Sequence, residues 1–154
     1  MPYWLVKSEP HKYPWEQLLK DGRTCWDGVR NYQARNNLQA MKKGDAVLFY
    51  HSNEGLAVVG IARVVKEAYP DPTTDDSRWI AVDIEPVETL EKPILLSTMK
   101  TDPRLQNIAL INQARLSVMP LTKEEFTVIV SKERGEKQGK SRGGAHIVGR
   151  ETPC

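Results

Sequence analysis

The hydrophobic positions of this chain fall into short runs that are typical of β-strands. Residues 3–6 are apolar and stop at a turn-like Ser-Glu-Pro, and residues 79–85 alternate between apolar and more polar side chains. Two largely apolar runs, 46–50 and 56–65, flank a polar turn and predict a β-hairpin. Two shorter runs follow later in the chain. We therefore expect strands at residues 3–6, 46–50, 56–65, 79–85, 93–96 and 115–119.

Three other segments carry apolar residues at helical spacings, together with signals of a helix end. Pro14 and Gly22 bracket the first, because proline suits the first helical position and glycine the residue after the last. Asn31 suits the N-cap of the second helix. Thr122 and Glu125 match a capping box, which predicts a last helix.

These elements predict a small α+β domain, in which short strands close towards a barrel and helices lie at its flanks. The length of 154 residues suits one such domain. After residue 130 the composition changes to glycines with interspersed charges, which indicates a flexible basic tail. We therefore expect a folded domain at residues 2–130 and a tail at residues 131–154.

The charge of the chain is small and unevenly distributed. The net charge is +2, and the tail carries +3, which leaves −1 for the first 130 residues. A nearly neutral body argues against tight binding to any duplex, which needs many phosphate contacts, but it allows recognition of a single nucleotide. The cations of the tail are either solvated charges or a non-specific contact to nucleic acid.

Several function classes are not expected. No apolar run approaches the ~20 residues that span a bilayer, and no secretory leader is evident, so we expect an intracellular protein, cytoplasmic or nuclear in a eukaryote. The three histidines are scattered without ligand-like spacing, so we expect no metal. The sequence contains no phosphate-binding loop and no dinucleotide fingerprint, so we expect no cofactor. No heptad predicts a partner helix, and we expect a monomer.

Residues 26–37, Trp-Asp-Gly-Val-Arg-Asn-Tyr-Gln-Ala-Arg-Asn-Asn, have the most unusual composition in the chain. Two aromatic residues, two arginines and five amides or acids surround one glycine. Such a mixture is typical of a pocket that stacks on a flat polar ring and binds its edges and a nearby phosphate.

Several blocks of sequence closely resemble the EVE-domain family. The blocks are residues 3–10, 26–37, 49–53, 59–62, 67–72 and 115–118, in the order that the family has them. The resemblance covers about residues 2–130. It implies a PUA-like fold, a small closed or partly open β-barrel with flanking helices, related to the YTH domains that read methylated adenine in RNA.

The resemblance also implies a function. EVE domains are thought to recognise modified bases in DNA or RNA and are not established as enzymes. We therefore expect a non-catalytic module whose partner is DNA or RNA that carries a modified, for example methylated, base in an aromatic-lined pocket. No cofactor is expected.

The aromatic candidates for this pocket each have a structural alternative. The YTH resemblance places a cage residue in the block of Trp26, which could otherwise be a core residue at a strand end. Trp79 falls on the more polar face of its strand. Tyr50 and His51 end an apolar strand and could line the same cavity, although a histidine at such a place is more often structural.

Polar candidates surround these aromatic residues. Lys7 and Ser8 follow a strand end. In the related YTH domains the corresponding block contributes to nucleotide binding. The alternative is that the two residues form a turn that caps the strand. Arg30 and Asn31 precede a helix and suit a phosphate or a base edge. Alternatively, Asp27 pairs with Arg30 and Asn31 only caps the helix.

Two further arginines, Arg35 and Arg115, could contact backbone phosphates or could be buried structural residues.

Two other function classes remain open. A small hydrolase or nucleotide-processing enzyme could use Cys25 as nucleophile and His51 as base, with Asp27 or Asp45 to orient the histidine. No nucleophile-elbow glycine pattern surrounds Cys25. The third class is a protein-interaction module that uses the barrel edge.

Overall fold

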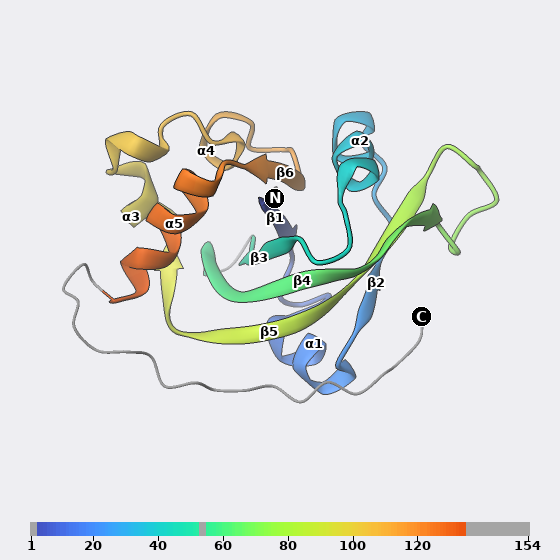
Figure 1. The fold of residues 1–154 in the computed structure, drawn as a ribbon, viewed down its shortest axis with the longest axis horizontal. Coiled ribbons are helices and arrows are strands. Elements are labelled where there is room, and N and C mark those ends of the chain that lie inside the picture. Colours follow the sequence, from blue (N-terminus) through green and yellow to red (C-terminus); the bar gives the residue numbers. More distant parts are fainter. Residues whose placement is uncertain (1–2, 53–54, 135–154) are drawn as a thin grey trace.

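The computed structural model describes residues 3–52 and 55–134, which form one curved sheet surrounded by helices (Figure 1). The strands pair in the order β2-β5-β4-β3-β1-β6. They are β1 Tyr3–Ser8, β2 Thr24–Trp26, β3 Ala46–His51, β4 Ala57–Pro70, β5 Ile80–Leu95 and β6 Val118–Leu121. The helices are α1 Trp15–Asp21, α2 Tyr32–Ala40, α3 Leu96–Lys100, α4 Ala109–Asn112 and α5 Lys123–Ser131, with 3-10 turns at Pro103–Leu105 and Lys132–Arg134.

The predicted α+β class is confirmed, and the barrel is the partly open form. Strand β1 pairs parallel with β3, whereas the other four pairings are antiparallel. Within the described residues, β2 and β6 are the two edges of the sheet and do not pair with each other. The long strands β4 and β5 curve across the whole molecule, so that the sheet wraps around its core without closing (Figure 1).

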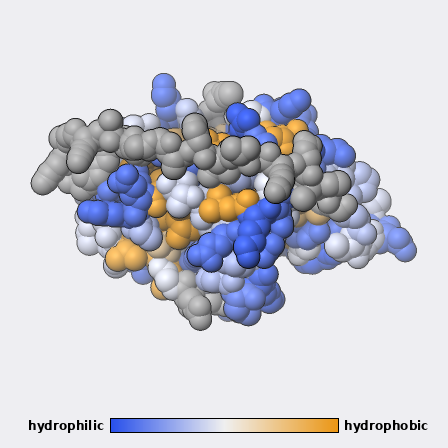
Figure 2. Space-filling model, turned by 90° about the horizontal axis from the view of Figure 1, so that it is seen from below, coloured by the Kyte–Doolittle hydropathy of each residue, from blue (hydrophilic) through white to orange (hydrophobic). Residues whose placement is uncertain are grey.

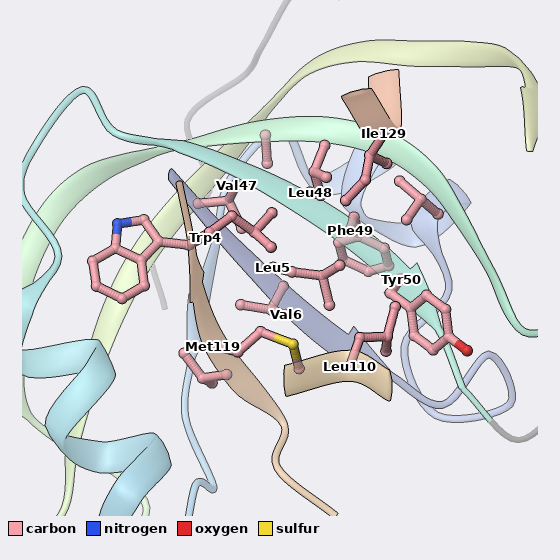
Figure 3. Packing of buried hydrophobic residues seen from close by; sticks show 14 of the residues in the cluster. Trp4, Leu5, Val6, Val47, Leu48, Phe49, Tyr50, Leu110, Met119 and Ile129 are labelled. Carbon is pink, nitrogen blue, oxygen red and sulfur yellow. The ribbon is translucent and has the colours of Figure 1, made fainter. Parts of the chain in front are cut away.

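The parallel pair of β1 and β3 lies at the centre of the core. Both strands are buried on both faces, as their unbroken apolar runs predict. Side chains from three further elements converge on the pair in Figure 3. They are Met119 from β6, Leu110 from α4 and Ile129 from α5, all with at most 4% of their surface exposed.

The hairpin of β4 and β5 is much longer than the sequence indicates. Strand β4 continues to Pro70, and β5 runs through to Leu95, so the separate strand expected at residues 93–96 belongs to β5. The pairing shifts register at several points, and two of these shifts lie opposite Pro86 and Pro93. Such irregularities release the ladder hydrogen bonds that proline cannot donate, which explains how one strand holds both prolines.

The more polar face of the alternation in residues 79–85 is largely buried, as is the apolar face. The four consecutive residues Ala81, Val82, Asp83 and Ile84 are all buried. The carboxylate of Asp83 accepts hydrogen bonds from the hydroxyl of Tyr69 and, at 3.0 Å, from the guanidinium of Arg23. A charged side chain can therefore lie in the buried half of β5 because it is paired there.

The predicted helices begin and end close to their capping residues. The side chain of Asn31 accepts the third helical N–H of α2, and Thr122 and Glu125 form the reciprocal capping box of α5. Gly22 ends α1 in the left-handed conformation, with a φ of +74°. Pro14 is the N-cap of α1, one position before the expected one.

The shortest elements escaped prediction. Strand β2 and helices α3 and α4 have only three to five residues each, too few to show a hydrophobic period. Strand β6 begins at Val118, so residues 115–117, which we expected in a strand, form a turn before it.

The ordered packing runs past the boundary expected at residue 130. The ammonium group of Lys132 donates to the buried carboxylate of Asp102 at 2.6 Å, and Glu133 accepts the backbone N–H of Glu91. Residues 132 and 133, which we expected in the tail, therefore pack on the domain, and residues 135–154 lie outside the described residues.

Helix α1 is held on the sheet by Trp15, whose indole ring lies directly against Gly60 of β4. A Cβ atom on Gly60 would overlap three carbons of that ring. The indole also packs edge-on against Phe49, with ring centroids 5.2 Å apart, and donates its N–H to Thr89 at 2.8 Å. Only glycine at residue 60 lets α1 approach the sheet this closely.

Gly60→Ala is expected to lower the free energy of unfolding by about 1–3 kcal/mol, because the new methyl group must displace the Trp15 ring from a close-packed site. Urea denaturation measures the loss. The control is the same substitution in a Trp15→Leu protein, which has no indole ring at this place. There Gly60→Ala should lower the free energy of unfolding by at least about 1 kcal/mol less than it does in the wild type. An equal loss in both backgrounds would show that the indole is not the obstacle.

Candidate nucleic-acid interface

Trp26 ends β2 and belongs to a group of aromatic rings that we call the Trp26 cluster, formed by Tyr13, Trp26, Phe49 and His51. The Trp26 ring meets Tyr13 and Phe49 edge-on, with centroids 6.4 and 5.6 Å apart. Phe49 is fully buried, whereas Trp26 is only half-buried. The ring is therefore packed on the core and keeps part of its surface open to solvent, as a wall of a stacking pocket requires.

His51 also contacts Phe49 and accepts a hydrogen bond from the backbone. Its ring meets Phe49 edge-on at 5.8 Å, and its Nε2 atom accepts the N–H of Trp15 at 3.0 Å. Burial lowers the pKa of His51, against a smaller opposing effect of Glu16. In the neutral ring that this hydrogen bond requires, Nδ1 carries the proton and is a donor.

The same hydrogen bond bears on the alternative in which His51 serves Cys25 as a base. Its Nε2 lone pair is already occupied by the Trp15 N–H, so this nitrogen is not available to accept a proton. Asp45, offered as a group to orient the histidine, instead accepts the indole N–H of Trp4 and the backbone N–H of Lys42, both at 2.9 Å. The geometry of these residues is that of structural contacts.

Lys7 and Ser8 connect the end of β1 to two neighbouring segments. The ammonium group of Lys7 donates to the carbonyl of Ala114 at 2.6 Å, and the hydroxyl of Ser8 donates to the carbonyl of Tyr13 at 2.6 Å. Burial lowers the pKa of Lys7. Ser8 thus positions Tyr13 beside Trp26, and Lys7 has further N–H donors beyond the one it uses.

Tyr50 does not lie at an open surface. Only 2% of its surface is exposed, and it belongs to the core that Figure 3 shows around β3. Burial raises the pKa of its hydroxyl. A pocket contact for Tyr50, as the sequence suggested, would require the core to open, and we do not include it in the proposed site.

Asp71, which the sequence did not single out, joins residues 27–31 to the loop between β4 and β5. Its fully buried carboxylate accepts the N–H of Gly28 at 2.9 Å, the guanidinium of Arg30 at 3.0 Å and the hydroxyl of Thr73 at 2.6 Å. Burial alone would raise the pKa of Asp71, but these hydrogen bonds outweigh it and lower the pKa to about 2. Asp71 is therefore ionised throughout the physiological pH range.

Arg30 and Asn31 each have a structural partner in this arrangement. Arg30 forms its ion pair with Asp71 rather than with Asp27, and Asn31 caps α2. Burial and the nearby charge of Asp71 raise the pKa of Asp27. Asp27 directly follows Trp26 in the chain and is exposed.

Trp79 lies in a second aromatic group. Its ring packs against Tyr32, with centroids 5.2 Å apart and planes inclined by 32°. The guanidinium groups of Arg30 and Arg78 lie 5.6 and 6.0 Å from the Trp79 centroid, and that of Arg35 lies 5.5 Å from the Tyr32 centroid. We call Tyr32, Arg35, Arg78 and Trp79 the aromatic–arginine surface.

Among the arginines whose side chains the structure describes, Arg35 and Arg115 are the two that form no ion pair with a described residue. Among the described residues, five arginine side chains form ion pairs, namely Arg23, Arg30, Arg63, Arg78 and Arg104. Arg35 and Arg115 form none with any described residue. Arg35 instead donates to the side chain of Asn36 and to the carbonyl of Arg78, while Arg115 is exposed in the turn before β6.

The structure therefore divides the residues that the sequence assigned to one pocket. Trp26, His51, Lys7 and Ser8 lie around the adjoining ends of β1, β2 and β3, whereas Arg30, Arg35 and Trp79 lie where α2 meets the β4–β5 loop. Sequence reasoning missed Tyr13, Asp71 and Arg78. It also gave no role to Tyr32, although this tyrosine directly follows the predicted cap in the segment already singled out.

Two negative findings concern the described residues. Within residues 3–52 and 55–134, no group of three or more histidine, cysteine, aspartate or glutamate side chains could hold a metal ion. No helix in the same part of the chain is long and apolar enough to cross a membrane.

Known proteins resemble this chain in sequence and in structure. The protein-family model of the EVE domain matches residues 2–132. Thymocyte nuclear protein 1 from Mus musculus is 40% identical, over 87% of this chain and 74% of its own length.

Among solved structures, a protein from Agrobacterium tumefaciens is 46% identical with a TM-score of 0.85, over 86% of this chain and 93% of its own. Human THYN1 protein, solved in complex with 5-methylcytosine containing DNA, is 37% identical with a TM-score of 0.82, over 90% and 100% of the two chains. The YTH domain of Zygosaccharomyces rouxii MRB1 protein shares the fold at 13% identity and a TM-score of 0.56, over 86% of each chain.

Asp71→Asn is expected to lower the free energy of unfolding by roughly 2 kcal/mol at pH 7, because the ionised carboxylate is stabilised by about two pKa units in the folded protein. The folded pKa is below the ordinary value of 3.8, so this stability is present above pH 4 and is lost as the pH falls towards 2. Denaturation of the wild type and of Asp71→Asn at several pH values between 2 and 7 measures this difference in the free energy of unfolding.

Asp75→Asn is the matched control, because Asp75 is exposed in the same loop. We expect it to behave like the wild type at every pH. A difference between Asp71→Asn and the wild type that persists unchanged at pH 2 would contradict the assignment of the low pKa to Asp71.

Proposed function

The chain belongs to the EVE-domain family, and from this premise we propose that it is a non-catalytic module that recognises a modified base in DNA or RNA. The observation that carries the proposal is the half-open ring of Trp26, held edge-on by Tyr13 and Phe49 at the end of β2. A relative that was solved with 5-methylcytosine containing DNA supports the class of ligand. A methylated base is the simplest modified base for such a site.

The energetics of base extrusion fit a pocket of this kind. Flipping a base out of a duplex costs a few kcal/mol, and stacking on an aromatic side chain returns roughly 1–3 kcal/mol. Trp26 therefore compensates much of the extrusion cost for any base. Burial of one additional methyl group contributes about 0.8 kcal/mol, which is a preference of about fourfold.

Polar groups around the ring can supply further selectivity. We assign the carboxyl group of Asp27 to the exocyclic amino group of a cytosine or adenine, which is a donor, and the Nδ1–H of His51 to a ring nitrogen or carbonyl acceptor. Lys7 keeps N–H donors for the nearest phosphate or base edge. A base whose edge lacks these groups would leave partly buried polar atoms without partners, which weakens its binding.

Trp26→Ala is expected to abolish the preference for one modified base, because the stacking surface is lost. The measurement is the ratio of dissociation constants for matched oligonucleotides with and without the modification. Fluorescence anisotropy with single- and double-stranded DNA and RNA, methylated or hydroxymethylated on cytosine or methylated on adenine, gives this ratio for the wild type and the variant.

Trp26→Phe separates stacking from packing. Phenylalanine keeps an aromatic ring against Phe49, so this variant should retain most of the preference while Trp26→Ala loses it. Thermal unfolding of both variants confirms that binding is measured on folded protein. Equal binding of all oligonucleotides by the wild type, or an unchanged preference in Trp26→Ala, would contradict the proposal.

A further inference from the structure

We infer that the aromatic–arginine surface, Tyr32, Arg35, Arg78 and Trp79, is a second nucleic-acid contact that binds the sugar-phosphate backbone next to the recognised base. This inference rests on the proposed function and adds a division of roles. The Trp26 cluster selects the base, and the aromatic–arginine surface supplies affinity without selectivity, because phosphate contacts carry no direct sequence information.

The charge of Arg35 is the first argument. The neighbouring cations Arg30 and Arg78 are neutralised by Asp71 and Asp76, both at 3.0 Å. Arg35 has no such partner among the described residues and donates only to neutral oxygens, at 3.1 and 3.2 Å. A guanidinium has five N–H donors, so several remain for a phosphate, which arginine binds in bidentate geometry.

The second argument is that Arg35 is already held in position. Its guanidinium lies 5.5 Å from the centroid of Tyr32 and bonds to the carbonyl of Arg78. Arg78 in turn donates to the hydroxyl of Tyr32 at 2.8 Å, and Tyr32 packs on Trp79. A side chain that is ordered before binding loses less conformational entropy when it captures a phosphate.

The exposure of Tyr32 and Arg78 beside the half-buried Trp79 and Arg35 is the third argument. Tyr32 is 52% exposed, the most exposed of the large hydrophobic side chains that are at the surface in the described residues. The end of the molecule where the β4–β5 loop projects in Figure 1 is mainly hydrophilic in Figure 2. Exposed aromatic rings interleaved with arginines are typical of surfaces that track single strands and phosphate backbones.

The two sites lie within reach of one oligonucleotide. Residues 26 and 32 are separated by six residues, which span at most about 20 Å, and this length corresponds to about six nucleotides along one strand of a duplex. The bonds of Asp71 to Gly28 and Arg30 hold the connecting segment against the β4–β5 loop. One strand can therefore contact both sites in a fixed register.

Arg35→Ala tests the inference. In anisotropy titrations over a series of salt concentrations, it should weaken binding of modified and unmodified oligonucleotides about equally, by roughly fivefold. It should also reduce the slope of log affinity against log salt by about 0.7 for single strands or 0.9 for duplexes, as for one lost phosphate contact. The ratio of the two affinities should not change, whereas Trp26→Ala changes that ratio.

The matched control is Arg63→Ala, which removes the same charge from an exposed arginine that is paired with Glu85 on β4 and β5. It should leave the salt slope unchanged. Arg35→Lys keeps the charge and should retain most of the slope. Thermal unfolding distinguishes a purely structural role for Arg35, which would lower stability without altering the slope.

The outcomes separate this inference from the proposed function. In one outcome, Arg35→Ala binds with the affinity and the salt slope of the wild type while Trp26→Ala loses its preference for the modified base. That result would overturn the inference and leave the proposed function standing. A reduced slope in Arg35→Ala, without any preference of the wild type for a modified base, would support the backbone contact and overturn modified-base recognition. Failure of the wild type to bind any oligonucleotide would overturn both.

Discussion

The close approach of Trp15 to the bare backbone of Gly60 is the contact on which the arrangement of the Trp26 cluster depends. It sets helix α1 on the sheet, and the backbone N–H of Trp15 then fixes His51. Tyr13, two residues earlier, is held by Ser8 and meets Trp26 edge-on. A small residue in β4 therefore determines how three rings from separate segments face one another, because a close-packed interior transmits the position of each group to its neighbours.

The distribution of charge is the basis for proposing an interface with two parts. Asp71 is buried and ionised, and it binds Arg30 and the backbone of residue 28, so this pair serves to hold the segment after Trp26 in place. The proposed phosphate contact is instead Arg35, one turn into α2, which forms no ion pair with any described residue. An arginine held by a carboxylate and an arginine without one lie within a few residues of each other here, and their partners distinguish them.

Local chemistry made much of the fold predictable. Asn31 and the Thr122–Glu125 pair mark helix starts because their side chains bond to backbone only a few residues away. Strands β1 and β3 were evident from apolar runs that are buried on both faces. The length of β5 was not predictable, because Pro86 and Pro93 are ordinarily strand breakers, and only irregular pairing with β4 accommodates them. Strand β2 has three residues and exists because β5 pairs with it.

The sequence by itself determined the family, the α+β class, the main helix boundaries and the segment, residues 26–37, from which the proposed interface is built. The family follows from the resemblance of whole blocks of sequence, and the others follow from side-chain type and short-range spacing. Only the tertiary structure decided that this segment serves two places, with Trp26 beside Phe49 and Tyr32 beside Trp79. It also decided which arginine is neutralised. Partners such as Asp71 are about forty residues away from Arg30 in the chain, and composition and spacing carry no signal of a pairing that long-range folding creates.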